Sequence, residues 1–366
     1  MTMESGRIAP PRYCYQPWSN LFVRPYGKVQ PCCQNTTELG NLHRQALEEI
    51  WNAPPLQNIR ALIAAGRYDE AGCQTSCPLR LAVDQCPELI SPDWLQRQGE
   101  GSDGEKARRN WEGFLDGWRR GAAVIESRPL CVDIQPSLLC NQHCFMCRQN
   151  HGDPAVLPVS LIRGMLPFLD HAPTLRLQGG EVFFLEGFAA LALEIKAGLA
   201  PFQHLAIVTN GSLLTPELAD GLIHGPGEVR FIVSMDGVTE ATFRKVRRSG
   251  HFQRVMAVLR HLAAAQRRMN RPELVQWNYV LMRSTLGELE AAVTLAGELG
   301  VLFNLIFLQG DFPEEDLLNP AGRLSWEEAA MIRRVIDGAA GRSGFSTLPL
   351  EILLRQAGEV RYGHSN

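Results

Sequence analysis

The sequence predicts an α/β protein whose main part is an open, partial barrel of six β/α units, preceded by a small cysteine-rich domain. Two observations predict this arrangement. From about residue 129 onward, short apolar runs alternate with stretches of helical spacing, which favours a parallel sheet with right-handed crossovers. Before residue 90, six of the ten cysteines gather in one segment, which marks a separate functional unit.

The six strands of the barrel are expected from apolar runs bounded by polar or glycine-rich turns. They are residues 131–135, 174–178, 205–209, 229–234, 277–282 and 302–308. Each run is followed by helical spacing, as with Leu286, Leu289 and Val293 after the fifth, and Ser325 with Glu328 predicts a capping box at the last helix. Six units are too few to close an eight-stranded TIM-type barrel, so we expect a curved, open (β/α)6 sheet.

The domain boundaries follow from the same pattern. We expect the cysteine-rich domain at residues 10–90 and a connector at 91–128 that ends in a helix over about 111–126. The partial barrel is expected at 129–345, and a C-terminal tail at 346–366.

Composition narrows the function classes. The 366 residues are 45% hydrophobic, enough for one large core and a smaller module, and the net charge of −3 gives no basic field for nucleic acid. No apolar run approaches the ~20 residues of a membrane span, and the first residues lack the regions of a signal peptide. Ten cysteines without an export signal favour a reducing, cytoplasmic location and metal ligation over disulfides.

Cys140, Cys144 and Cys147 form a C-x3-C-x2-C segment, which is the most informative pattern in the chain. Three thiolates at this spacing can hold one iron–sulfur cubane and leave its fourth iron open to a ligand. A zinc site is the alternative, and it would need a fourth ligand such as His143 or His151.

Further motifs follow the triplet in order, and together they resemble those of the radical S-adenosylmethionine (SAM) superfamily. They are Gly179-Gly180-Glu181, Thr209-Asn210-Gly211, Ser234-Met235-Asp236-Gly237 and the segment 246–252 around Arg247. Each motif follows one of the expected strands. In parallel α/β folds ligands bind at the carboxyl ends of the strands. The expected strands place all of these motifs at that one end of the sheet, which we call the rim.

The resemblance implies a set of cofactor-binding residues. They are Gly179, Gly180, Glu181, Asn210, Ser234, Asp236, Arg247, Asn278 and Arg283. The two glycines would let the backbone approach the ligand, and Glu181 would bind the ammonium group of SAM. Ser234 and Asp236 would bind ribose hydroxyls, and Arg247 the carboxylate. A strand-ending turn, helix capping and purely structural roles remain the alternatives, especially for Asn278 and Arg283.

The cysteine-rich segment resembles the SPASM and twitch auxiliary-cluster domains. Its ligand candidates for an auxiliary [4Fe–4S] cluster are Cys14, Cys32, Cys33, Cys73 and Cys77, with Cys86 as a possible substitute. Two amphipathic helices, at 43–51 and 56–65, would bring these cysteines together. The segment departs from the family by preceding the barrel and by closing with C-x3-C, and a zinc ribbon is the alternative.

The resemblance implies reductive cleavage of SAM to a 5′-deoxyadenosyl radical that abstracts a substrate hydrogen. We expect an epimerase or a dehydrogenase in natural product biosynthesis, acting on a carbohydrate-containing or other small molecule. A ribosomal-peptide maturase forming thioether or C–C crosslinks, and a non-catalytic iron–sulfur or zinc protein, are the alternatives.

The remaining expectations concern the hydrogen donor and the partners. Cys131 on the first strand is the candidate hydrogen donor, with Cys86 or an unused member of Cys32 and Cys33 as rivals, and a buried structural cysteine as the alternative. The partners would be a small-molecule, glycoside or peptide substrate and an electron donor such as flavodoxin or ferredoxin, with no nucleic acid and no membrane.

Overall fold

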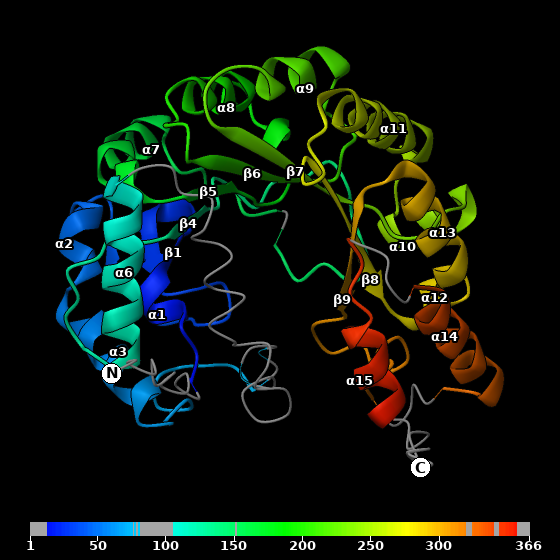
Figure 1. Cartoon of the computed structure of the whole chain (residues 1–366), viewed down its shortest axis with the longest axis horizontal. Coiled ribbons are helices and arrows are strands. Elements are labelled where there is room, and N and C mark those ends of the chain that lie inside the picture. The colour runs from blue at the N-terminus through cyan, green and yellow to red at the C-terminus, as the bar shows by residue number, and fades with distance from the viewer. Residues whose placement is uncertain are drawn as a thin grey trace, which may run out of the picture.

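The computed structural model describes residues 13–75, 77, 80, 105–150, 152–319, 324–339 and 344–356, which build one curved sheet (Figure 1). Its nine strands lie in the order β3-β2-β1-β4-β5-β6-β7-β8-β9. Their bounds are β1 Asn20–Val23, β2 Lys28–Gln30, β3 Gly40–Asn41, β4 Cys131–Ile134, β5 Thr174–Leu177, β6 His204–Thr209, β7 Glu228–Ser234, β8 Val275–Leu281 and β9 Leu302–Phe307. Strand β1 runs parallel to β4, and β4 to β9 are all parallel, whereas β2 is antiparallel to both of its neighbours.

Strands β4 to β9 confirm the six expected strands, each to within two residues at either end. Successive side chains of a strand point to opposite faces of the sheet, and the residues of these segments alternate accordingly. Val132 and Ile134 of β4 are fully buried beneath the outer helices, while Cys131 and Asp133 face the concave side. The concave side is the lumen of a half-open barrel, as the arch in Figure 1 shows.

The helices that follow the strands lie along the outer side of the arch (Figure 1). They are α7 Val159–Met165, α8 Phe188–Ala197, α9 Pro216–Ile223, α10 Glu240–Arg247, α11 Phe252–Met269, α12 Arg283–Leu286, α13 Leu289–Leu299 and α14 Trp326–Ala339, with the short 3-10 turns η3 Leu166–His171 and η4 Val182–Phe184. The expected capping box is confirmed at α14. Ser325 N donates to Glu328 Oε2 at 2.7 Å, and Glu328 N donates to Ser325 Oγ at 3.2 Å.

The N-terminal region adds α1 Gln16–Ser19, η1 Pro25–Gly27, α2 Leu47–Trp51 and α3 Pro54–Ala64. The helix expected at 56–65 is confirmed as α3, which buries Leu56, Ile59 and Ile63. The helix expected from residue 43 begins only at Leu47. Asn41 explains the difference, because its side chain and carbonyl accept from residues 43–45 and hold a turn there.

Two helices lie where the sequence suggested less structure. α6, Glu105–Arg119, begins before and ends earlier than the helix expected at 111–126, and it buries Phe114 and Trp118. α15, Leu348–Gln356, occupies the start of the expected tail, and it buries three leucines against the rest of the core. Residues 76, 78–79, 81–104 and 357–366, which include Cys86, lie outside the described residues, so the rival role of Cys86 has no structural account.

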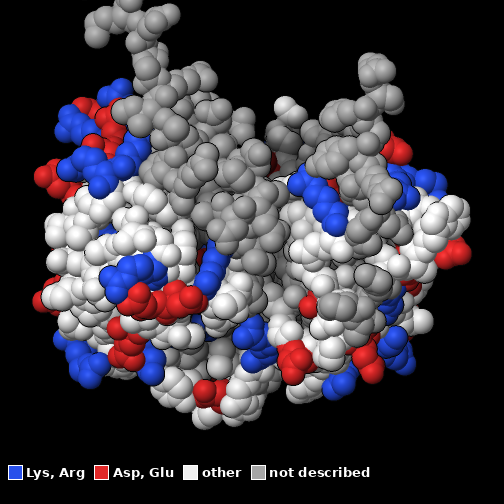
Figure 2. Space-filling view, turned by 90° about the horizontal axis from the view of Figure 1, so that it is seen from below, with Lys and Arg blue, Asp and Glu red and all other residues white. Residues whose placement is uncertain are grey.

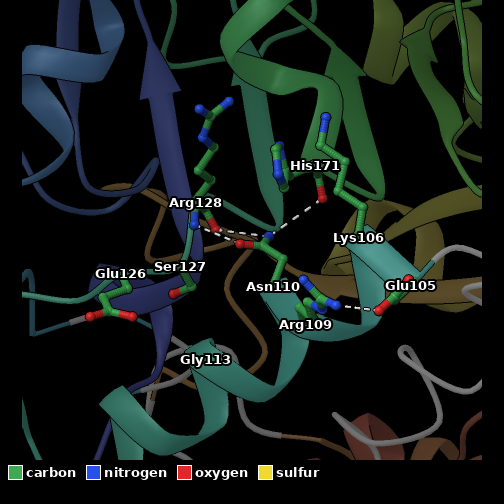
Figure 3. Close-up of a pocket in the computed structure, with 9 residues that line it drawn as sticks. All are labelled: Glu105, Lys106, Arg109, Asn110, Gly113, Glu126, Ser127, Arg128 and His171. Atoms are coloured by element: carbon green, nitrogen blue, oxygen red, sulfur yellow. Dashed lines mark hydrogen bonds and ion pairs between the residues drawn. The ribbon is translucent and has the colours of Figure 1, made fainter.

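The N-terminal region and the barrel share one hydrophobic core as well as one sheet. Trp51 donates its indole N–H to Ser127 O at 2.5 Å, across the junction. Asn110 of α6 makes a second junction, in a surface pocket of about 410 Å³ (Figure 3). Its Nδ2 donates to the carbonyls of Arg128 and His171 at 3.1 and 3.4 Å, and its Oδ1 accepts from Arg128 N at 2.6 Å. These contacts fix the segment before β4.

On the face seen in Figure 2, acidic and basic side chains of the described residues are interspersed. Among the described residues, no helix combines the length and the apolarity that crossing a bilayer requires.

Candidate active site

The C-x3-C-x2-C cysteines lie in a loop that leaves the carboxyl end of β4. Phe145 donates its backbone N–H to Val246 O at 3.1 Å, which fixes this loop against the end of α10. Asn210 Nδ2 lies 3.7 Å from Cys140 Sγ, and Arg247 Nη1 lies 3.9 Å from Cys144 Sγ. N–H groups therefore already face two of the three sulfurs.

Burial controls the protonation of these thiols. It raises the pKa of Cys140 to about 11, and it also raises the pKa of Cys144 despite the nearby Arg247. Without metal, both groups are therefore thiols at neutral pH. Iron must displace these protons when it binds, because thiolates are the ligands.

Positions 179 and 180 must be glycine because the backbone that leads into the cysteine loop packs directly against them. A Cβ on Gly180 would lie 1.9 Å from Leu139 O and 2.4 Å from Leu138 O, and a Cβ on Gly179 would lie 2.6 Å from Ser137 O. The loop backbone thus packs directly on the two glycines. The sequence had suggested close approach of a ligand, whereas the observed neighbour is the segment that carries Cys140.

Glu181 is buried and its carboxylate is used within the protein. Oε1 accepts from Thr209 Oγ1 at 2.8 Å, and Oε2 accepts from Asn210 N at 2.7 Å. Burial raises the pKa of Glu181, and these hydrogen bonds partly offset that effect. The carboxylate therefore holds the end of β6 against the end of β5, and a contact with the ammonium group of SAM would have to share these donors.

Asn210 connects this turn to the cysteine loop. Its Nδ2 donates to Asn141 Oδ1 at 2.9 Å, and Asn141 Nδ2 donates to Ser212 Oγ at 2.9 Å. Ser212 in turn donates to Asn210 Oδ1 at 2.7 Å. The closed ring of hydrogen bonds sets the position of Asn210 beside Cys140.

Asp236 and Arg247 form a buried ion pair, with 2.6 Å between Oδ2 and Nη2. Asp236 Oδ1 also accepts from Val280 N at 2.7 Å, which fixes the carboxylate on β8. Burial raises the pKa of Asp236, and Arg247 counteracts this. The Nε of Arg247 is buried without a hydrogen-bond partner among the described residues. The nearby Ser234, half-buried at the end of β7, pairs with β8 through its backbone, and its hydroxyl has no hydrogen-bond partner within that part of the chain.

Asn278 and Arg283 lie in different surroundings. Asn278 faces the lumen, and its Oδ1 accepts from Gln276 Nε2 at 2.7 Å and from Asn304 Nδ2 at 3.0 Å. Arg283 instead forms an ion pair with Glu328 at the start of α14. Asn278 therefore faces the lumen cavity, while the ion pair of Arg283 with Glu328 supports the structural alternative.

A cavity of about 1030 Å³ occupies the lumen. Its walls include Cys131, Asp133 and Arg176, and Arg176 Nη1 donates to Asp133 Oδ1 at 2.8 Å. Burial raises the pKa of Cys131 to about 12. The condition for a catalytic role of Cys131, that it face the lumen, is thus met.

The five N-terminal cysteines that the structure describes line this same cavity, at the amino ends of the barrel strands. Burial raises the pKa of Cys14 most, and the thiols of Cys32, Cys77 and Cys73 raise it further. For Cys33, burial and the Asp133 carboxylate raise the pKa most, so this thiol lies toward the lumen ion pair. The rim motifs and the N-terminal cysteines therefore lie at opposite ends of one lumen.

Two family profiles match the chain. The iron–sulfur cluster-binding domain SPASM matches residues 14–78, and the radical SAM superfamily matches residues 134–296. Residues 134–296 thus form a radical SAM domain. The SPASM domain precedes the barrel, as expected, and the family brings a SAM-binding [4Fe–4S] cluster, an auxiliary cluster and SAM itself.

Individual relatives cover part of the chain. The mycofactocin maturase MftC of Mycobacterium tuberculosis is 26% identical over 187 residues, which are 50% of this chain and 45% of the relative. A GTP 3',8-cyclase of Synechococcus sp. is 34% identical over 52% of this chain and 58% of its own. The chain thus spans about half the length of the curated relatives it matches. The crystal structure of Streptococcus suis SuiB is 14% identical, with a TM-score of 0.47 over 79% of this chain and 63% of that chain.

The residues present fit both clusters of a radical SAM protein. At the rim, amide and guanidinium N–H groups face the sulfurs of Cys140 and Cys144, and such donors suit thiolate ligands of a cluster. At the other end, more than the four thiols that a fully ligated cubane needs line one cavity. Within the described ranges, no three His, Cys, Asp or Glu side chains are grouped around a single-ion position.

Sequence reasoning missed several residues of this radical SAM site. Asp133 and Arg176 lie at alternate positions of apolar strands, where a polar inward residue was the available signal. Thr209 was quoted within a motif, but its bond to Glu181 depends on the neighbouring strand. Arg24, which approaches the auxiliary cysteines, lies in a segment with no motif of its own.

Proposed function

We propose that this radical SAM enzyme removes a hydrogen atom from a polar substrate in the lumen, with SAM held where the strands end. The lumen cavity is the observation that carries the proposal. At about 1030 Å³ it reaches from the auxiliary cysteines to Asn278 on β8. Ligand sites usually measure about 300–1,000 Å³, so a natural product of moderate size has room there.

At the rim, Cys140, Cys144 and Cys147 would hold the SAM-binding cluster. The cluster and SAM supply a 5′-deoxyadenosyl radical once a flavodoxin or ferredoxin provides one electron. Arg247 offers its buried Nε–H to the carboxylate of SAM, while Asp236 holds the guanidinium in place.

The other rim motifs take supporting roles in this proposal. Ser234 presents its hydroxyl to the ribose, whereas Asp236 acts by holding Arg247 in place for the carboxylate of SAM. Gly179, Gly180, Glu181 and Asn210 keep the cysteine loop and the strand ends in register.

The lumen favours a substrate rich in hydroxyl groups. Two of its guanidinium groups are paired with carboxylates, since Arg176 pairs with Asp133 and Arg230 pairs with Glu273. Amide side chains of Gln178, Gln276 and Asn278 supply donors and acceptors between these pairs. These neutral hydrogen-bonding groups suit a carbohydrate-containing natural product.

Hydrogen return by Cys131 would make the reaction an epimerisation. Cys131 begins β4, roughly 10 Å from the carboxyl end of that strand, so it would approach the substrate from the side opposite SAM. Its raised pKa of about 12 keeps the S–H bond intact at neutral pH. The S–H bond breaks as the new C–H bond forms, and the thiyl radical regains one electron from the same protein donor and one proton from solvent.

Dehydrogenation is the other outcome of the same first step. Without hydrogen return, the substrate radical loses one electron and one proton. Because the auxiliary cysteines line the same cavity, the electron acceptor would sit beside the substrate.

The experiment is anaerobic reconstitution with SAM, reductant and candidate substrates in deuterated water. Solvent deuterium in the product identifies epimerisation through a thiol, and a loss of two hydrogens identifies oxidation. Cys131→Ala should form 5′-deoxyadenosine but no epimer, while Cys33→Ala, the matched variant of the second lumen thiol, should still form it. Unchanged epimer formation in Cys131→Ala would remove this residue from the mechanism.

A maturase is the second candidate, and the similarity to MftC favours it because that relative is a maturase. The same assay with candidate precursor peptides tests it. A crosslinked peptide that lacks two hydrogens would replace the carbohydrate proposal.

A non-catalytic role is the third candidate. If it is right, no 5′-deoxyadenosine forms even when about eight irons are bound per chain.

A further inference from the structure

Arg24 is a cation without a carboxylate partner beside the auxiliary cysteines. It follows β1 directly, and its guanidinium lies 4.6 Å from the centre of the Phe22 ring. Nε donates to Gln30 Oε1 at 2.7 Å, Nη1 donates to Gln135 Oε1 at 3.0 Å, and Nη2 donates to Cys33 O at 3.5 Å. All three acceptors are neutral oxygens, so the positive charge is held in place without being compensated.

Nearby arginines show the contrast. Arg176 bonds to Asp133, and Arg80 forms an ion pair with Asp69. No Asp or Glu in the described part of the chain lies within ion-pair distance of Arg24. Gln30 and Gln135 are both buried and occupy positions where a carboxylate would have neutralised the guanidinium.

The guanidinium of Arg24 interacts electrostatically with the neighbouring cysteines. Arg24 is half-buried, and burial lowers its pKa, whereas the thiols of Cys33 and Cys32 act in the opposite direction. A half-buried charge without a partner is unfavourable unless an anion lies nearby. A cubane held by four thiolates carries two negative charges when oxidised and three when reduced, so it supplies that anion.

We propose that Arg24 is a positioning residue of the auxiliary site, whose uncompensated guanidinium stabilises the reduced auxiliary cluster and so raises its reduction potential. A fixed positive charge favours the state with one more negative charge, and nearby charge and hydrogen bonds are known determinants of cluster potentials. The proposal requires only that the auxiliary cluster is bound. It stands whether the substrate is epimerised or dehydrogenated.

The test is an anaerobic potentiometric titration of the holoenzyme, followed by electron paramagnetic resonance. Adding SAM changes the signal of the SAM-binding cluster, so the unchanged signal reports the auxiliary cluster. We expect Arg24→Gln to lower the reduced-to-oxidised ratio of that cluster about tenfold at a fixed applied potential, which is about 59 mV for one electron. Arg24→Lys keeps the charge and should stay close to the wild type.

Lys28→Gln is the matched control. It removes one positive charge from the same domain, but Lys28 is exposed and paired with Glu38, so neither cluster should shift. The potential of the SAM-binding cluster should also be unchanged in Arg24→Gln, since that cluster belongs to the other end of the lumen.

Three outcomes overturn the proposal: an unshifted auxiliary potential in Arg24→Gln, an equal shift in Lys28→Gln, or an equal shift in Arg24→Lys. Loss of auxiliary iron from Arg24→Gln but not from Arg24→Lys supports the role of the charge. Loss from both variants contradicts it, because the geometry of the guanidinium would then be what matters.

Discussion

The contact between Gly180 and the cysteine loop gives the sharpest prediction. In Gly180→Ala the new Cβ would lie 1.9 Å from Leu139 O and 2.4 Å from Leu138 O. Contacts between carbon and a carbonyl oxygen normally lie at about 3.3–3.6 Å, so the loop must move by roughly 1.5 Å. Both neighbours are backbone atoms, and no side-chain rotation relieves the clash. The displaced segment leads directly to Cys140.

The expected result is a specific loss at the SAM-binding cluster. A displacement of about 1 Å at a reacting centre costs about 100-fold in rate, and overpacking costs about 1–3 kcal/mol of stability. We therefore expect Gly180→Ala to form 5′-deoxyadenosine at least about 100-fold more slowly. Its iron content should fall from about eight toward about four per chain, because the auxiliary cysteines are not displaced.

Gly164→Ala is the matched control, because a Cβ at this position in α7 would meet no atom within 4 Å. It should keep wild-type iron content, deoxyadenosine formation and melting temperature. The reasoning is refuted if Gly180→Ala matches Gly164→Ala in all three measurements. A loss of all iron from Gly180→Ala would also refute it, because the damage would then extend to the auxiliary site.

Three further predictions concern the ligands, the buried ion pair and pH. Cys32→Ala should retain about four irons per chain and Cys33→Ala about eight, as measured by iron analysis, and the reverse would exchange their roles. Asp236→Asn leaves Arg247 uncompensated and should lower the free energy of unfolding in urea by about 3–5 kcal/mol; a change below about 1 kcal/mol would contradict this. Burial acts to raise the pKa of Glu288, but hydrogen bonds from residues 238, 239 and 242 lower it overall. The stabilisation by Glu288 is therefore present above about pH 4.3 and lost as the pH falls through its lower folded value, so Glu288→Gln should show a flatter loss of stability in acid.

The sequence predicted local features of the barrel well. The strands were found because each buries an apolar face under a helix, as Val132 and Ile134 do on β4. The capping box of Ser325 and Glu328 was found because it needs only two residues at a fixed spacing. The rim motifs were found because the end of a strand and a motif coincide in the sequence.

The remaining features depend on contacts between distant segments. The pairing of β1 with β4 joins residues more than 100 positions apart, and no periodicity of apolar residues in the sequence predicts it. The use of Glu181 by Thr209 and Asn210 depends on the neighbouring strand. The same holds for Cys33, because its adjacency to Cys32 does not say which of the two thiols lies beside Asp133.

The pairing of β1 with β4 has a further consequence for the behaviour of the barrel on its own. β4 is an interior strand only because β1 covers it, and the sheet on that side then ends at β3, two residues long. A fragment that begins after residue 104 would expose the unpaired backbone of β4 beside the buried side chains of Val132 and Ile134. Unpaired apolar sheet edges can pair with other chains, so we expect such a fragment to self-associate. β1 of the N-terminal region therefore also covers a sheet edge of the barrel that would otherwise be open to other chains.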